Sequence, residues 1–217
     1  MFRAPAPPDR VLQEIYETLL QPRCLLPRTP YRFARGRRVV RTVKVDPKTK
    51  LTDGGVDFRT LNPNGYVPVL QLDNGELLTE AVVILQYIAD QHPAAALAPP
   101  AGTMARYRLL EWLNFISSEL HKTYSVLFAP TTPEEYKTVA REKLAQRLGH
   151  VERKLAGRQY LLGDSFTIAD VYLFVIVNWS RVTGVDLTAF PTLQQFQAHI
   201  VKRPAVQTAM KAEGLVK

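Results

Sequence analysis

The chain has 217 residues, of which 46% are hydrophobic, and its 28 Lys and Arg against 20 Asp and Glu give a formal net charge of +8 at pH 7. This length is ample for one or two domains with a buried core, and the single cysteine excludes a disulfide framework and a multi-cysteine metal cluster, so we expect no metal site. No apolar run approaches the ~20 residues of a membrane span and the first ten residues lack the apolar core of a secretory signal, so we expect a cytoplasmic protein that does not bind membranes.

Most of the positive charge lies in residues 1–42, which contain nine Arg, no Lys and three acidic residues. Their net charge is +6, so the rest of the chain carries only +2 of the total. The segment is also rich in Pro and shows neither a helical nor a strand period, which is typical of an irregular basic arm. One hypothesis is that this arm binds nucleic acid, which predicts salt-sensitive binding that is lost when residues 1–42 are deleted.

The next part of the chain has the pattern of a small mixed α/β unit. Residues 42–46 are partly β-branched and alternate weakly, which predicts a short strand, and residues 56–62 predict a helical turn. The apolar runs 67–72 and 76–78 are joined by Asp-Asn-Gly, which predicts a β-hairpin. Helical spacing of the apolar residues over 81–92 then predicts a helix.

From residue 103 onward the pattern is nearly all helical. An Ala/Pro-rich linker over 93–100 marks the expected domain boundary. Helical spacing follows over 104–128, 133–155, 168–182 and 193–201. The sequence therefore predicts a mixed α/β unit followed by an all-helical domain.

Thr167 and Asp170 carry a capping signal at the start of one of these helices. The Thr167 hydroxyl can accept a hydrogen bond from the backbone N–H of Asp170, and the Asp170 carboxylate can accept one from the N–H of Thr167. Such a cap stabilises a helix by about 1 kcal/mol. We therefore expect a structural role for Asp170 and no catalytic one.

Pro68 opens the first strand of the hairpin. It could be an ordinary proline of an edge strand, where the sheet does not need the backbone N–H that proline lacks. Alternatively, a cis Val67–Pro68 bond could turn the Val67 backbone outward and leave it available to a peptide-like ligand. The sequence leaves both alternatives open.

Two further positions are candidates for contact with a ligand. Glu80 precedes a helix whose N-terminus would favour a ligand carboxylate, and Glu80 itself could pair with an ammonium, or simply be a favourable first-turn acid. His121 could be a structural histidine, or a neutral imidazole that donates a hydrogen bond to a thiolate. Cys24 is weak evidence for a nucleophile, because only nearby Arg could lower its pKa.

Together these segments resemble the glutathione S-transferases, specifically the bacterial beta class. The matching stretches include LNPNGYVPVLQLDNGELLTEAVVILQYIAD, RLLEWLNFISSELHKTYSVLF and LLGDSFTIADVYLF, and they run from about residue 43 to the C-terminus. The resemblance implies an α/β thioredoxin-like domain over 43–93, an all-α domain over 101–217 and a homodimer. It implies an enzyme of detoxification that attacks a small electrophile, or a disulfide, with the thiolate of glutathione, which is a co-substrate, so that no cofactor is expected.

The resemblance also implies roles for individual residues. Val67 beside Pro68 would pair with the glutathione backbone, and Glu80 with the N–H of Ala81 would hold the γ-glutamyl end. The catalytic residue would be His121, near the sulfur. The remaining residues expected to bind glutathione or line the cleft, some of them reaching the partner subunit's site, are Lys50 at the glycine carboxylate, Tyr66, Asn114, Ser118, Glu119 and Lys122. The apolar wall for the electrophile could come from Tyr66, Phe115, Tyr124 and Trp179, unless these are core or interface residues.

Residues 1–42 depart from the family, which begins with a strand, a loop carrying Gly-Ala-Cys-Ser and a helix. Suitable codons for residues 16–27, translated one base later, give Met-Lys-Leu-Tyr-Tyr-Asn-Pro-Gly-Ala-Cys-Ser, which is a beta-class N-terminus. Our hypothesis is that a one-base deletion or a sequencing error near Thr42 and Val43, with an upstream start, produced an aberrant segment 1–42. Cys24 is then not the family cysteine, and the thioredoxin-like domain lacks its first strand, cysteine loop and first helix.

Resequencing of the gene across the codons of Thr42 and Val43 tests this hypothesis, and an intact frame with no missing base contradicts it. A frame change would also explain the basic arm without nucleic acid, so we do not expect nucleic acid as a partner. The loss of the cysteine loop favours one alternative function for the chain as written. This alternative is a catalytically impaired relative that binds glutathione or another protein.

Overall fold

The computed structural model describes residues 30–32, 43, 45–46, 48–72, 74–212 and 214–216. Cys24 and nearly all of the Arg-rich segment 1–42 lie outside the described residues, and so does the predicted N-terminal arm. The exception is strand β1, Pro30–Arg32, which the sequence pattern did not predict. Three residues are too few to show a period of two, so a strand this short is set by its partner strand rather than by its own pattern.

The described strands form one small sheet in the order β1-β2-β3. β2, Val69–Gln71, pairs in parallel with β1 and antiparallel with β3, Leu77–Thr79, which confirms the predicted hairpin. The strand predicted at 42–46 was wrong within the described residues, because Val45 makes only an isolated bridge with Thr52. The Asp46 carboxylate accepts hydrogen bonds from the next backbone amides and turns the chain at that point.

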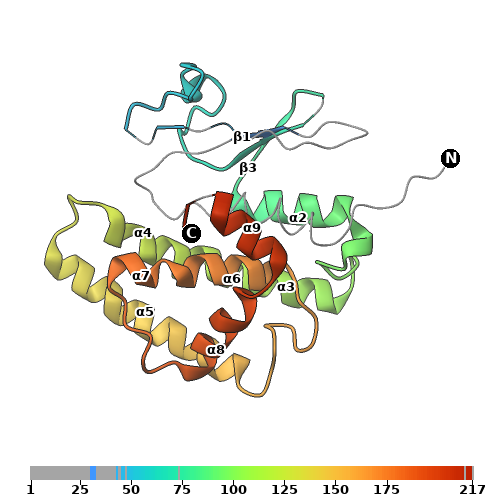
Figure 1. The fold of residues 1–217 in the computed structure, drawn as a ribbon, viewed down its shortest axis with the longest axis vertical. Coiled ribbons are helices and arrows are strands. Elements are labelled where there is room, and N and C mark those ends of the chain that lie inside the picture. Colours follow the sequence, from blue (N-terminus) through green and yellow to red (C-terminus); the bar gives the residue numbers. More distant parts are fainter. Residues whose placement is uncertain are drawn as a thin grey trace.

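Helix α2, Ala81–Gln91, lies between the sheet and the other helices (Figure 1). One single-turn helix precedes β2, η1 at Phe58–Thr60 as predicted, and another follows α2, η2 at Pro93–Ala95 in the linker.

The buried guanidinium of Arg106, on the first helix of the C-terminal part, joins this part to α2. It forms two hydrogen bonds of 2.8 and 2.9 Å to the carboxylate of Asp90 on α2 and a third to the carbonyl of Pro99 in the linker.

The C-terminal part is helical, as expected. Its first predicted helix is continuous but has three sections, α3, η3 and α4, and η3 is a π-helix. The sections are α3 Met104–Phe115, η3 Ile116–His121 and α4 Lys122–Phe128, followed by α5 Glu134–Leu155, α6 Ile168–Asn178, α7 Ser180–Thr183, α8 Pro191–Ile200 and α9 Pro204–Ala212. The sequence pattern did not predict α9. None of the helices in the described part of the chain combines the length and the apolar character needed to span a bilayer.

Helix α6 is the centre of the helical part (Figure 1). Every residue from Ile168 to Val177 is buried, which is the pattern of a helix covered on all sides. The predicted capping box at its start is confirmed, since Thr167 and Asp170 exchange both hydrogen bonds. Burial raises the pKa of Asp170 to about 6, so its carboxylate is still an ionised acceptor at pH 7.

Candidate functional site

His121 lies at the last position of the π-helical segment η3. The N–H of Lys122 donates to the carbonyl of Ser117, five residues earlier, so this turn holds one residue more than an α-helical turn. Ile116 and Leu120 are fully buried, and η3 packs against α5 and α6. The extra residue changes which side chains face α6, and π-helical turns of this kind are frequent at functional sites.

Tyr172 on α6 holds the imidazole of His121. Its hydroxyl lies 2.6 Å from His121 Nδ1. Burial raises the pKa of Tyr172 to about 12, against the opposing effect of the nearby Ser117 side chain, so the phenol keeps its proton at neutral pH. We assign this proton to the bond with Nδ1. The neutral ring of His121 then carries its own proton on Nε2, where it is available to a ligand.

We expect His121 to stay neutral well below pH 7. Burial, and then the charge of Lys122, lower its pKa from 6.5 to about 4. The proton NMR signals of the ring should therefore remain unshifted until about pH 5, and a titration midpoint near the ordinary histidine value would contradict this assignment. The unfolded chain binds a proton at His121 near pH 6.5, whereas the folded chain binds it only near pH 4. The contribution of this residue to the free energy of unfolding is therefore fully present above pH 6.5 and is lost as the pH falls toward 4.

Glu80 lies at the N-terminus of α2. It is the N-cap residue, with φ at 69°, and its side chain makes no capping hydrogen bond. The side chain is exposed, yet the carboxylate is close enough to add to the rise in the pKa of Tyr172 that burial causes. α2 also packs against α6. Glu80 and His121, which are far apart in the sequence, therefore both act on Tyr172.

The Val67–Pro68 peptide bond is cis, as the second alternative for this proline expected, and contact of the Val67 backbone with a ligand stays a prediction. Val67 is 39% exposed and Tyr66 is 72% exposed, so the segment that precedes β2 faces outward. The Nδ2 of Asn62 donates to the carbonyl of Tyr66 at 2.7 Å and shapes the turn before it. Lys50 reaches the same turn, where its ammonium donates to the carbonyl of Gly65 at 3.1 Å.

The other residues predicted to line the cleft differ in their exposure and in the partners of their side chains. Asn114 and Ser118 are exposed, and the Ser118 hydroxyl donates to the Asn114 carbonyl one turn earlier. Lys122 is exposed next to His121. The carboxylate of Glu119 instead accepts a hydrogen bond from Arg147 Nε at 2.6 Å, so this side chain is directed toward α5.

Sequence reasoning missed Tyr172 and Ser117. A Tyr in a wholly buried helix needs a partner for its hydroxyl, and this was the available signal for Tyr172. Ser117 was missed because an α-helical count cannot anticipate the π-turn. Of the residues considered for the electrophile wall, Trp179 packs edge-on against His121 with ring centroids 4.9 Å apart, whereas Tyr124 is a fully buried core residue bonded to Ser180.

The chain matches two protein-family models and individual relatives. The model of the glutathione S-transferase N-terminal domain matches residues 38–91, and that of the C-terminal domain matches residues 115–204. The glutathione S-transferase GstA of Escherichia coli is 43% identical over 173 residues, which is 80% of this chain and 86% of that protein.

Two solved structures are similar to this chain in both fold and sequence. A sphingomonad glutathione S-transferase complexed with glutathione has a TM-score of 0.77 and 48% identity, and the match covers 80% of this chain and 87% of that one. A bacterial beta-class glutathione S-transferase of Sphingomonas chungbukensis has a TM-score of 0.80 and 40% identity over 97% of this chain and 98% of that one. With a thioredoxin-like N-terminal domain and an all-helical C-terminal domain, the chain belongs to the glutathione S-transferase family, close to its bacterial beta-class members.

Proposed function

We propose that this glutathione transferase binds glutathione between three parts of the fold: the N-terminus of α2, the segment at Val67 and Pro68 before β2, and the segment η3. It then conjugates the glutathione thiol to small electrophiles. The observation that carries this proposal is the pairing of His121 Nδ1 with the hydroxyl of Tyr172 at 2.6 Å. This pairing leaves a neutral imidazole with its Nε2–H free to donate.

The chemistry that this donor supports is nucleophilic attack by a thiolate. A hydrogen bond to the charged form of an acid lowers its pKa, so an Nε2–H directed at the sulfur raises the thiolate fraction at neutral pH. The thiol proton goes to solvent. The sulfur then forms a bond to an electrophilic carbon, and the leaving group departs with its electron pair. Attack on a disulfide sulfur would follow the same course, with a thiolate as leaving group.

Three features support binding of the tripeptide. The carboxylate of Glu80 and the N–H groups that open α2 suit the ammonium and the carboxylate of a γ-glutamyl group. The outward-facing segment at Val67, before β2, suits the peptide backbone of a ligand. Lys50, beside Gly65, suits the carboxylate at the glycine end. The sphingomonad relative was solved with glutathione, which agrees with this class of ligand.

The proposal predicts saturable conjugation of glutathione to 1-chloro-2,4-dinitrobenzene, followed by absorbance. Glu80→Gln removes the partner of the ligand ammonium, and we expect it to raise KM for glutathione about tenfold with little change in kcat. The control is Glu76→Gln, because Glu76 is an exposed acid in the hairpin before Glu80, and among the described residues its side chain forms a hydrogen bond only with Asn74. Equal KM values for the two variants would contradict the role of Glu80.

The same assay separates this function from the alternative that the sequence left open. Retention on immobilised glutathione without any turnover would favour a relative that binds glutathione but does not conjugate it. Absence of both retention and turnover would contradict the proposed site altogether. We assign the reaction to the cytoplasm, where thiols are kept reduced.

We also propose that the protein acts as a homodimer. α2 and α3 are joined by the Arg106–Asp90 pair, and both helices expose large apolar side chains. Val83 is 45% exposed, Met104 67% and Tyr107 54%. Burial of such side chains against a second copy would remove them from water. Sedimentation equilibrium at micromolar concentration measures the association, and a monomer at all concentrations would contradict it.

A further inference from the structure

The sequence contains two Asn-Gly pairs, Asn64-Gly65 and Asn74-Gly75, and the structure describes both. Asparagine is a thermolabile residue, and glycine after it favours spontaneous deamidation because no side chain hinders ring closure by the glycine nitrogen. The first pair lies in the turn before the cis Val67–Pro68 bond, and the second lies in the turn between β2 and β3. One chain thus carries the same reactive pair in two structural settings.

The backbone of the two pairs is similar. The N–H of Gly65 donates to the Asn62 carbonyl at 2.8 Å, and that of Gly75 donates to the Leu72 carbonyl at 2.9 Å. Both glycines have positive φ, at 65° and 89°. Both asparagines are exposed, but Gly65 is buried whereas Gly75 is exposed. Accessibility of the glycine alone would therefore favour reaction at the second pair.

The side chains of the two asparagines differ. The carboxamide of Asn74 is held at both ends, because its Oδ1 accepts from the N–H of Glu76 at 3.0 Å and its Nδ2 donates to the Glu76 carboxylate. The carboxamide of Asn64 forms no hydrogen bond with any residue that the structure describes, and only its backbone N–H is bonded, to Oδ1 of Asn62 at 3.2 Å. Ring closure requires Cγ to rotate toward the glycine nitrogen. Asn64 can do so freely, whereas Asn74 must first break two hydrogen bonds, one of them to a charged group.

Asn64 lies beside groups of the proposed glutathione site. The next residue, Gly65, accepts a hydrogen bond from the ammonium of Lys50 at 3.1 Å, and a Cβ at Gly65 would lie 3.7 Å from Cε of Lys50, so the stem of this lysine passes over the turn. The same turn leads directly to Tyr66 and Val67. A change of charge or of chain length at Asn64 therefore acts on the two groups that suit the glycine end and the backbone of the tripeptide.

We propose that Asn64 is a site of spontaneous deamidation, and that its products bind glutathione more weakly. The Gly65 nitrogen attacks Cγ of Asn64, a C–N bond forms, and the side-chain nitrogen leaves as ammonia with the proton of the Gly65 amide. Water then adds to either carbonyl of the resulting succinimide ring and breaks its bond to the ring nitrogen. The products are aspartate and isoaspartate, and the new carboxylic acid loses its proton at pH 7.

The effect on glutathione rests on the function proposed above. The new carboxylate lies one residue from the carbonyl that Lys50 contacts, so it pairs with the ammonium and competes with the carboxylate of the ligand. Isoaspartate also adds a methylene group to the main chain and shifts the residues up to Val67. Neither change touches His121, so we expect KM for glutathione to rise and kcat to stay the same.

Peptide mapping by fragment-ion mass spectrometry measures the modification on the full chain incubated at mildly alkaline pH. We expect Asn64 to be converted about tenfold faster than Asn74, because only Asn74 loses side-chain hydrogen bonds on ring closure. Glu76→Ala frees Nδ2 of Asn74 and should raise its rate about threefold without changing the rate at Asn64. Equal rates at the two asparagines of the unaltered chain, or faster conversion of Asn74, would overturn the site.

Steady-state kinetics measure the consequence for binding. A preparation converted at Asn64 should show KM for glutathione raised about fivefold with unchanged kcat, and Asn64→Asp should reproduce the part due to charge. Asn74→Asp is the matched control, since it places the same charge on the other Asn-Gly pair, and Asn64→Gln should keep its KM through the incubation. Unchanged KM after conversion of Asn64, in a chain that conjugates glutathione when fresh, would overturn the effect on binding alone. A fresh chain with neither conjugation nor retention on glutathione would instead contradict the proposed function, while the mass spectra still decide the site.

Discussion

Replacement of Asp170 by alanine is expected to lower the free energy of unfolding by about 4 kcal/mol. The carboxylate is fully buried and accepts hydrogen bonds of 2.8 Å from the N–H groups of Leu161 and Thr167 and one of 3.0 Å from the Thr167 hydroxyl. Each buried donor left without an acceptor costs about 1–3 kcal/mol, and loss of the helix cap costs about 1 kcal/mol. Urea unfolding followed by circular dichroism measures the change.

Asp186 provides a matched control for this substitution. It also accepts two local hydrogen bonds of 2.8 Å, from the amide and the hydroxyl of Thr188, but it is exposed. Water can replace the lost acceptor there, so Asp186→Ala should change the unfolding free energy by less than about 1 kcal/mol. If Asp170→Ala were no more destabilising than Asp186→Ala, the capping box would not be the anchor of α6.

The second large effect is expected at His121. His121→Ala removes the proposed Nε2–H donor to the thiolate, and hydrogen bonds to charged groups contribute about 1.5–3 kcal/mol. We therefore expect the pKa of the bound glutathione thiol to rise by about one to two units, and kcat/KM below that pKa to fall about 10- to 100-fold. Thiolate absorbance and the pH profile of conjugation measure these two quantities. Unchanged values of both would remove His121 from the mechanism.

Tyr172→Phe distinguishes a positioned imidazole from one that is merely nearby. Without the phenol hydroxyl, His121 Nδ1 loses the partner that fixes the tautomer of the ring. We therefore expect part of the loss of kcat/KM seen in His121→Ala. The nitrogen NMR shifts of the ring should report a mixture of tautomers. Tyr124→Phe is the control, since it removes an equally buried hydroxyl, bonded to Ser180, that does not touch His121. A loss of stability with unchanged tautomer in both variants would contradict the positioning role.

Much of the fold could be predicted from local sequence. The hairpin at 67–78 and helix α2 follow from short patterns of apolar residues and turn residues, and the cap at Thr167 follows from two positions three residues apart. Strand β1 could not be predicted in this way, because three residues extend only when β2 lies beside them. Val45 shows the converse, since a β-branched pattern there gave a single bridge once Asp46 turned the chain.

The candidate site also combines features that local sequence predicts with features that depend on tertiary contacts. Sequence could mark Glu80, Pro68 and His121 as unusual positions, because a helix start, a proline at a strand edge and a histidine in an apolar helix are all local features. It could not predict that Tyr172 holds His121, because 51 residues separate them in the chain. Their contact depends on how η3 packs against α6, which is a property of the assembled core.

The direction of side chains along the helix from Met104 to Phe128 was also decided by tertiary structure. The family resemblance implied that five residues of this helix line the cleft, some of them reaching the partner subunit's site: Asn114, Ser118, Glu119, His121 and Lys122. The π-turn adds a residue at Ile116–His121, and the cations of α5 attract the Glu119 carboxylate. Glu119 and His121 therefore face different neighbours.

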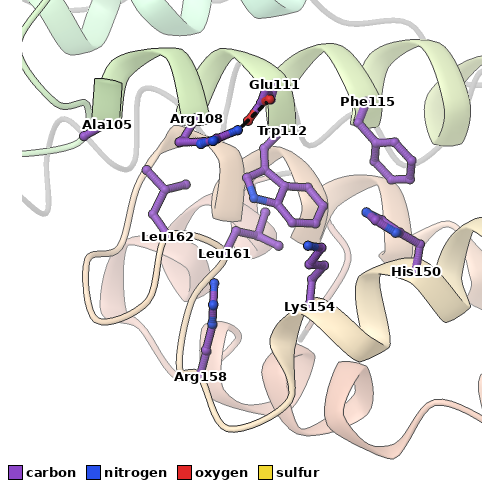
Figure 2. Close-up of a pocket in the computed structure, with 10 residues that line it drawn as sticks. All are labelled: Ala105, Arg108, Glu111, Trp112, Phe115, His150, Lys154, Arg158, Leu161 and Leu162. Carbon is purple, nitrogen blue, oxygen red and sulfur yellow. Dashed lines mark hydrogen bonds and ion pairs between the residues drawn. The ribbon is translucent and has the colours of Figure 1, made fainter. Parts of the chain in front are cut away.

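The sequence by itself determined most of the helices of this glutathione transferase, its hairpin, the cap at Thr167 and its family, because these depend on residues close together in the chain. The charge of +8 pointed to an anionic partner, but most of it lies in residues 1–42, outside the described part of the chain. Only the tertiary structure decided that Tyr172 meets His121 and that Trp112 lines a cavity between α3 and α5 (Figure 2), because these features arise where separate helices meet.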